Sequence, residues 1–333
     1  MKKITIYLIL VIFIIAGILF LLSRVPAVQD ALFQRLAQSL ISTAPNIFPE
    51  EDSLSALVCG SKSPLPHPTR AETCVMIKAG KETFIFDVGN KSIDNLRNWR
   101  VPLNQLNSIF ISHLHSDHIA ELPEIHMWNW VGTGRQSKLK VYGPEGINQV
   151  LNGFTEAYSL DWKYRNDHHG DQFAPLKAAG FDGYEITDFS KPVYESNGIV
   201  ITAFLVDHKP IDPSLAFKIE YKGRSIVLSG DTVYSEAILN NSKNVDVLFH
   251  EAFHKGTLDM MYNALPENSS SRIAIVDIQN YHTNTIEVAN LAKEANVGHL
   301  LYYHLIPAPR TDLVADIFTL SLIHISEPTR PRL

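Results

Sequence analysis

The stretch FISHLHSDHIAELPE, residues 110–124, places three histidines and one aspartate within six positions. Its first residues belong to the apolar run NSIFIS at 107–112, which predicts a buried strand. Polar side chains at the end of such a strand can be exposed surface residues, a buried cluster whose hydrogen bonds are satisfied, or a metal site. Because burying four candidate ligands in one tight turn would be costly without a cation, the pattern favours the metal site. The four side chains are His113, His115, Asp117 and His118.

Three further histidines and aspartates stand where apolar runs stop. His208 follows ITAFLVD, Asp231 follows SIVLSG, and His304 follows LLYY. Ligands of α/β sheets bind at such strand ends, so we expect these side chains to reach a common rim. Imidazole nitrogen and carboxylate oxygen together suit a borderline-soft metal. The sequence therefore predicts that the three residues extend the metal site of the first motif.

The bulk composition excludes several classes of protein. The chain has 333 residues, 45% of them hydrophobic, which suits one large domain or two smaller ones with a proper core. This composition excludes a disordered or fibrous protein. The formal net charge of -6 shows that the surface as a whole is not basic enough to indicate binding to a polyanion. A local basic groove remains an alternative.

The first residues differ from the rest of the chain. Lys2 and Lys3 precede an uncharged run from Ile4 to Leu22, and a bilayer needs roughly 17–25 such residues. The lysines favour a cytoplasmic N-terminus, which places the body on the periplasmic or extracellular side of an inner or plasma membrane. A cleaved signal peptide is the alternative, but no clean small-x-small site follows Leu22. We therefore favour an uncleaved anchor.

The rest of the chain divides by composition. We expect an anchor or signal peptide at 1–24, a juxtamembrane helix and proline-bearing linker at 25–53, and a hydrolase domain at 54–320. The residues 321–333 form an atypical tail that looks truncated or aberrant. Within the domain, residues 159–196 lose periodicity and predict an irregular insertion or lid. Cys59 and Cys74 are expected as small buried residues in neighbouring strands, although an oxidising compartment would permit a bond.

Several motifs resemble the metallo-β-lactamase superfamily: HLHSDH, a later histidine, SGDT, HEAF and a final histidine. Within it, YGPEG, KGRSIVLSGDT, HEAF and YHTNTIEVANLAKEA are similar, in this order, to the ribonuclease Z and arylsulfatase-like branch. The resemblance runs from about Leu57 to Pro307. It implies an α/β fold, a four-layer αββα sandwich in which two mixed sheets pack face to face with helices outside, preceded by the N-terminal segment.

The resemblance also implies two metal sites and an acid. Two zinc ions are expected, with manganese or iron as alternatives. The first ion would be held by His113, His115 and His208, the second by Asp117, His118 and His304, with Asp231 shared between them. The two ions would share a hydroxide as the nucleophile.

Three residues carry catalytic roles in this interpretation. Asp117 can also orient the hydroxide or accept its proton. His282 would protonate the leaving oxygen, and Glu251 would orient His282 and raise its basicity. A buried salt-bridge partner without a catalytic role is the alternative for Glu251. Asp87, in FDVG, is expected to support the metal-bearing loop.

The expected function is a membrane-anchored or secreted dinuclear zinc phosphodiesterase of ribonuclease Z type. An arylsulfatase-like sulfate ester hydrolase or a lactonase is the alternative enzyme, and a non-catalytic metal-binding module is the alternative from another class. Bacterial ribonuclease Z carries a long tRNA-gripping arm, but only fourteen residues separate His208 from Gly223 here. Expected partners are a small ester substrate or RNA, the membrane through the N-terminal segment, and a second copy of the chain.

Overall fold

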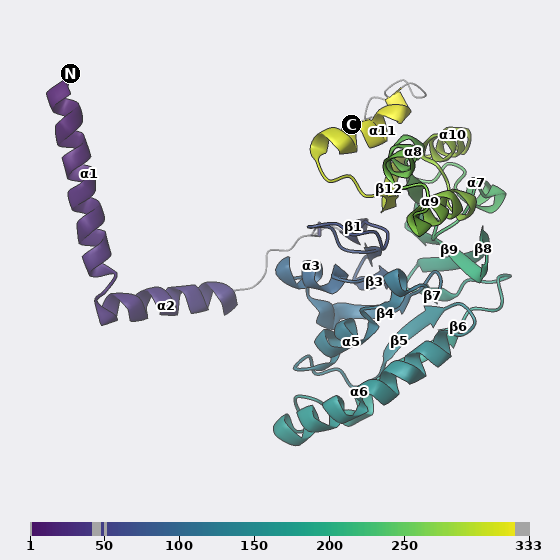
Figure 1. The fold of residues 1–333 in the computed structure, drawn as a ribbon. Helices are drawn as coiled ribbons and strands as arrows, with labels where there is room; N and C mark the ends of the chain where they lie inside the picture. Colours follow the sequence, from purple (N-terminus) through teal and green to yellow (C-terminus); the bar gives the residue numbers. More distant parts are fainter. Residues whose placement is uncertain (1, 42–47, 50–51, 324–333) are drawn as a thin grey trace. The chain divides into compact units, whose positions relative to one another are not determined.

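The computed structural model describes residues 2–41, 48–49 and 52–323. The chain divides into two compact units, residues 1–45 and 46–333. The first unit contains the helices α1 (Lys2–Leu22) and α2 (Pro26–Ile41), and α2 lies within residues 25–53, where a helix and a linker were expected (Figure 1). Among the described residues, Ile4–Leu22 is long and apolar enough to cross a membrane, a test that a signal sequence also passes.

The second unit contains two six-stranded sheets, both mixed as predicted. The first sheet has the order β1 (Leu54–Gly60), β2 (Cys74–Ala79), β3 (Glu82–Phe86), β4 (Leu106–Phe110), β5 (Leu139–Gly143) and β6 (Phe181–Glu185). In this sheet β1 to β3 are antiparallel and β3 to β6 are parallel. The second sheet has the order β12 (His299–Ile306), β11 (Val247–Phe253), β10 (Arg224–Leu228), β9 (Ile211–Tyr221), β8 (Ile199–His208) and β7 (Tyr194–Ser196). In this sheet β7 to β10 are antiparallel and β10 to β12 are parallel.

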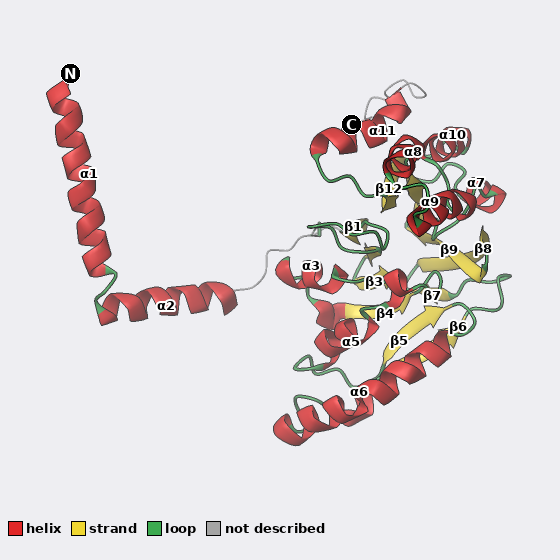
Figure 2. Cartoon of the chain, viewed as in Figure 1, coloured by secondary structure: helices red, strands yellow, loops and turns green. Residues whose placement is uncertain are grey.

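Helices connect the strands in the second unit, as Figure 2 shows. The helices on the side of the first sheet are α3 (Ser92–Asn98), α4 (Ser116–Ile119), α5 (Leu122–Trp130) and α6 (Ile147–His169). The later helices are α7 (Glu236–Asn241), α8 (Lys255–Ala264), α9 (Ser270–Tyr281), α10 (Thr285–Glu294) and α11 (Asp312–Ile323). Two short 3₁₀ turns lie at Leu103–Gln105 and Leu176–Ala178.

The alternation of side chains along the strands explains the four layers. In β2, Met76 faces the helices and packs in one cluster with residues of α3, α5 and α6. Its neighbours Val75 and Ile77 face the other way and pack against second-sheet residues such as Phe217 and Ile219. On the outer face of the second sheet, a further cluster contains residues of α7 and α10. Because strand side chains alternate between faces, this arrangement gives the predicted αββα sandwich.

The prediction of an irregular insertion at 159–196 is wrong. Helix α6 continues to His169, and this segment also contains β6 and β7. The C-terminal half of α6 buries Trp162 and otherwise carries polar pairs at i,i+4 spacing, such as Arg165 with Asp161 at 2.9 Å. Such pairs stabilise a helix without a hydrophobic repeat, so the sequence pattern gave no signal.

The two cysteines lie in the neighbouring strands β1 and β2 and form a disulfide. Both side chains are fully buried, as the sequence predicts, and the bond that the sequence left open is present. Most of the atypical tail, residues 324–333, lies outside the described residues, while 321–323 end α11.

A buried histidine in α5 is expected to make stability depend on pH. Nε2 of His126 accepts a hydrogen bond of 2.8 Å from the Gly180 amide, and the rings of Trp130, Trp162 and Phe181 lie around it. Burial, with a smaller contribution from Arg135, lowers the pKa of His126 from 6.5 to about 4. His126 therefore takes up a proton at a higher pH in the unfolded chain than in the folded chain. As a result, the free energy of unfolding falls as the pH falls from 6.5 towards 4.

We expect His126→Gln to remove this part of the pH dependence. At pH 7 the variant should be less stable than the wild type. The difference in the free energy of unfolding between the wild type and the variant should shrink by about 3 kcal/mol from pH 7 to pH 4, because one pKa unit is about 1.4 kcal/mol. Urea unfolding at a series of pH values measures it. A difference that stays constant with pH would contradict the assignment.

Candidate metal centre

The opening motif lies at the end of β4, where the chain turns into the short helix α4. His113 and His115 precede this helix, and Asp117 and His118 lie in its only turn. All but His115 are buried. The apolar residues of β4 are held between the helices and the second sheet, so the strand delivers these four side chains to one edge of the sandwich.

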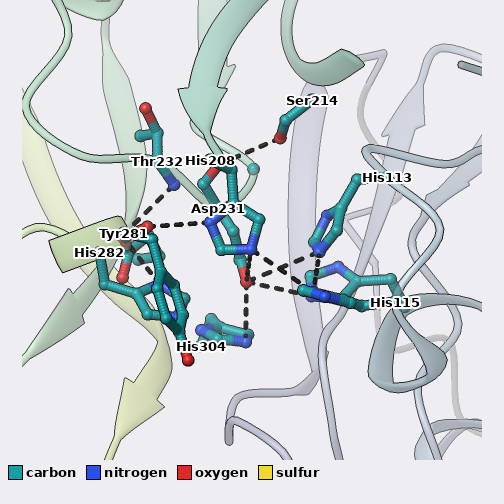
Figure 3. A network of polar contacts seen from close by, with 12 residues as sticks. His113, His115, His208, Ser214, Asp231, Thr232, Tyr281, His282 and His304 are labelled. Carbon is teal, nitrogen blue, oxygen red and sulfur yellow. Dashed lines mark hydrogen bonds and ion pairs between the residues drawn. The ribbon is translucent and has the colours of Figure 1, made fainter. Parts of the chain in front are cut away.

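The second sheet supplies the other predicted ligands at the same edge. His208 is the last residue of β8, Asp231 follows β10, and His304 lies in β12, where the register with β11 shifts. Gly230 has φ +59°, and a Cβ there would lie 2.3 Å from the Leu215 carbonyl oxygen, so only glycine allows this turn before Asp231. The structure thus brings all seven predicted metal-binding residues together. Figure 3 shows five of them, namely His113, His115, His208, Asp231 and His304.

Three imidazoles converge on one side of the centre. His113 Nε2 lies 2.9 Å from His115 Nδ1, which lies 3.4 Å from His208 Nε2. The ligand atoms of these three residues all lie within 4.8 Å of one another. Three nitrogens that face a common point are the donor set of a zinc-type site.

A second set of ligands lies on the other side. Asp117 Oδ2 is 3.1 Å from His304 Nε2 and 3.5 Å from His118 Nε2. These three residues also form a group within 4.8 Å. The chain therefore offers two sets of the composition expected from the sequence, one of three histidines and one of two histidines with a carboxylate.

One oxygen of Asp231 lies between the two sets. Asp231 Oδ2 is 3.1 Å from His304 Nε2 and 3.5 Å from His118 Nε2, and it is 3.9 Å from Nε2 of both His113 and His208. Within the described part of the chain, the other oxygen, Oδ1, is buried without a hydrogen-bond partner, and so is His118 Nε2. Buried polar atoms rarely stay unsatisfied, so these atoms fit bound cations.

Outer hydrogen bonds orient the ligands. Asp87 accepts bonds of 2.8 Å from the backbone amide and the hydroxyl of Ser112, and it lies 2.9 Å from His118 Nδ1. His208 Nδ1 donates to the carbonyl oxygen of Tyr281 at 2.9 Å. These contacts hold the Nδ1 proton and leave Nε2 of both histidines facing the centre. Asp87 therefore supports the metal-bearing loop as the sequence predicts.

The electrostatics of the centre suit cation binding. Burial, followed by His118, lowers the pKa of His113 well below its usual value, and burial also lowers the pKa of His208. Burial alone would raise the pKa of Asp231, but His304 and His118 bring it well below its usual value. Burial opposes the shift at Asp117 too, where His118 and His304 lower the pKa to about 2. Burial would lower the pKa of His118 and His304, but Asp231 and the other nearby carboxylates outweigh it and raise both. Because a metal binds neutral imidazole and charged carboxylate, a cation bound there would release the protons of these two histidines.

Glu251 and His282 lie beside the centre. Glu251 is fully buried in β11, and its Oε1 accepts a bond of 2.9 Å from the Thr283 amide. The same oxygen is 3.3 Å from His282 Nδ1, and Thr232 donates its amide to it at 3.4 Å. Glu251 thus holds the turn that carries His282 next to the ligands His208 and His304.

The basicity of His282 differs from the expectation. Burial lowers its pKa to about 3, and burial, with Asp231, raises the pKa of Glu251 well above its usual value. The expectation that Glu251 raises the basicity of His282 is therefore wrong for the metal-free chain. Because burial opposes both charges, the two side chains form a neutral pair and not a salt bridge.

The sequence missed contacts that depend on the backbone. The amides of Thr232 and Thr283 hold Glu251, and Ser112 bonds Asp87 through its own amide and hydroxyl. Tyr281 is the other missed residue, and its ring packs against His208 and His282. Its position directly before His282 was the one signal that could have found it.

Comparison with known proteins gives several matches. A family described as Anti-Pycsar protein Apyc1 matches residues 58–296. Ribonuclease Z of Mycobacterium bovis (strain BCG / Pasteur 1173P2) is 31% identical over 257 residues, which cover 77% of this chain and 87% of that protein. The metallo-β-lactamase fold protein YhfI from Bacillus subtilis has a TM-score of 0.58 at 20% identity, covering 81% of this chain and 94% of that one. The short form of human tRNase Z has a TM-score of 0.56 at 20% identity, covering 75% and 92%.

Proposed function

Because this chain belongs to the Anti-Pycsar Apyc1 family and to the ribonuclease Z branch of the metallo-β-lactamase superfamily, and is a metal-dependent hydrolase, we propose that it is a membrane-held dinuclear zinc phosphodiesterase. The observation that carries this proposal is the position of Asp231. Its Oδ2 lies 3.1–3.9 Å from four histidine nitrogens of both ligand sets. A single carboxylate so placed suits two ions better than one.

The donor atoms favour zinc. Imidazole nitrogens with carboxylate oxygens are the ligands of catalytic zinc sites, although manganese or iron accepts the same set. When bound, two such ions supply Lewis acidity and lower the pKa of a bound water to near neutrality. The residues that would hold them are His113, His115, Asp117, His118, His208, Asp231 and His304.

Two side chains handle protons in this proposal. Asp117, whose pKa is about 2, stays charged at neutral pH and can accept a hydrogen bond or a proton from the attacking water. His282 lies beside His208 and His304, with ring centroids at 5.0 and 5.3 Å. Because burial lowers its pKa to about 3, His282 is neutral in the metal-free chain, and it would carry the proton for the leaving oxygen when the negative charge of a bound substrate raises that pKa. Glu251 positions His282 through the bond that it accepts from the neighbouring Thr283 amide, and its Oε1 lies 3.3 Å from His282 Nδ1.

A small phosphodiester is the proposed substrate class. The ribonuclease Z relatives make a phosphodiester the first choice, and RNA remains a candidate. The strand β8 ends at His208 and β9 begins at Ile211, so the described chain carries a tight hairpin where a tRNA-binding arm would be inserted. This hairpin favours a small diester over precursor tRNA. A sulfate ester or a lactone is the alternative substrate.

A substrate panel tests this proposal. The zinc-loaded chain should hydrolyse bis(p-nitrophenyl) phosphate faster than p-nitrophenyl sulfate or a lactone, and a chelator should abolish the activity until zinc is restored. Faster hydrolysis of the sulfate or the lactone would replace the phosphodiesterase assignment. Bound zinc without any hydrolysis would indicate the non-catalytic module.

Two features support a location outside the cytoplasm. The helix α1 contains the run Ile4–Leu22, preceded by two lysines. The Cys59–Cys74 disulfide belongs in an oxidising compartment, because disulfides are rare in the cytosol. We therefore propose an inner or plasma membrane protein with its hydrolase domain on the periplasmic or extracellular side. A second copy of the chain is the other proposed partner, and light scattering would report it.

Fractionation checks the membrane proposal. We expect the full chain to stay with membranes after an alkaline wash, because an uncharged run of this length is stable in a bilayer. Deletion of the residues before Val25 should release the chain into the soluble fraction. A soluble mature protein that begins at Val25 or later would show instead that the segment is a cleaved signal.

A further inference from the structure

We propose that Tyr281 is a substrate-binding residue whose phenol donates a hydrogen bond to a phosphoryl oxygen held at the metal centre. This inference rests on the proposed phosphodiesterase function and deepens it. Tyr281 is the last residue of α9 and directly precedes His282. It thus enters the centre from a helix that supplies none of the metal ligands.

The backbone and the side chain of Tyr281 have separate roles. The carbonyl oxygen accepts the 2.9 Å bond from His208 Nδ1, which orients that ligand. The ring lies against the same centre, with its centroid 5.4 Å from that of His208 and 4.7 Å from that of His282 (Figure 3). A change in the side chain therefore leaves the support of His208 in place.

The hydroxyl of Tyr281 is unpaired in the part of the chain that the structure describes. Among the described residues no hydrogen bond to it is found, whereas the hydroxyl of Tyr302 donates to Thr285 O at 2.7 Å and that of Tyr303 accepts from the Gly230 amide at 3.0 Å. Tyr281 is partly exposed, so its hydroxyl is not buried at a cost. A free donor beside a reactive centre is available to a ligand.

A phenol is an O–H donor at neutral pH, because its ordinary pKa is about 10. The ring contacts place this donor beside His208, which belongs to the three-histidine set, and beside His282. A phosphoryl group held at the centre would therefore meet a donor that no metal ligand uses.

The alternative is that the ring merely packs against the two histidines. Tyr281→Phe separates the two interpretations, because it removes the hydroxyl and keeps the ring and the carbonyl. Tyr281→Leu removes both the hydroxyl and the ring contact. Tyr158→Phe, on the exposed face of α6, is the matched control for loss of one phenol.

We expect zinc-loaded Tyr281→Phe to keep its metal and to lose about 10- to 100-fold in kcat/KM on bis(p-nitrophenyl) phosphate, the range for a hydrogen bond to a charged group. Its affinity for phenylphosphonate, which has phosphoryl oxygens and no ester to hydrolyse, should fall similarly by calorimetry. Tyr158→Phe should match the wild type in both measurements.

Three outcomes overturn the inference: equal phenylphosphonate affinity in the wild type and Tyr281→Phe, activity loss in Tyr281→Leu alone, or loss of zinc from Tyr281→Phe. A wild type that binds phenylphosphonate more tightly than Tyr281→Phe but hydrolyses no diester would uphold the inference about Tyr281. That result would end the phosphodiesterase proposal. The failure of one can thus be told from the failure of the other.

Discussion

Asp231→Ala is expected to abolish both the binding of the two metal ions and the hydrolase activity. The carboxylate lies within 3.9 Å of histidine Nε2 atoms on both sides of the centre. Its removal also takes away the negative charge that balances the surrounding histidines. Because hydrolysis depends on both ions, activity should fall to the background, a loss of at least about 10³-fold.

Matched variants make this result specific. Asp188→Ala removes a carboxylate from an exposed loop and should keep full activity and metal content. His304→Ala should mainly empty the set formed with Asp117 and His118, and leave the three-histidine set able to bind one ion. Circular dichroism confirms that each variant folds. Full activity in Asp231→Ala would show that the carboxylate does not bridge two ions.

His282→Ala is expected to slow the reaction and to leave the metal in place. His282 faces the centre beside His208 and His304, but it belongs to neither predicted ligand set. General acid catalysis contributes roughly 10²–10⁴-fold, so the rate should fall by about this factor on a diester with a poor leaving group. On bis(p-nitrophenyl) phosphate the fall should be smaller, because p-nitrophenolate leaves almost without a proton.

The comparison of two leaving groups decides the role of His282. Glu251→Gln keeps an oxygen that can accept the Thr283 amide, and it should give a weaker form of the same pattern. Metal analysis runs beside the kinetics. Loss of metal from His282→Ala, or equal slowing of good and poor leaving groups, would exclude His282 as the acid and leave a plain two-metal hydrolase.

The ligands could be predicted because they stand at strand ends. A run such as ITAFLVD predicts a strand on its own, and the fold then fixes where the next residue, His208, must lie. The motif at 113–118 adds four polar side chains that a protein without a cation would rarely bury. The sandwich follows from the same runs, because alternating side chains need a cover on both faces of each sheet.

The features that could not be predicted from the sequence lack such a periodic pattern of buried residues. Helix α9 buries only Ile275 and exposes Ile273 and Val276, so no pattern predicted the helix that carries Tyr281. The second half of α6 is held by exposed ion pairs, which give no hydrophobic repeat. The pKa of His282 depends on burial in the folded chain, and no local sequence feature reports that burial.

Metal stoichiometry tests the two-ion centre most directly. The full chain, purified in detergent and loaded with zinc, should hold two zinc ions per chain by elemental analysis. His304→Ala should hold one, and Asp188→Ala should hold two. A wild-type chain that binds one ion or none under these conditions would contradict the bridging position of Asp231.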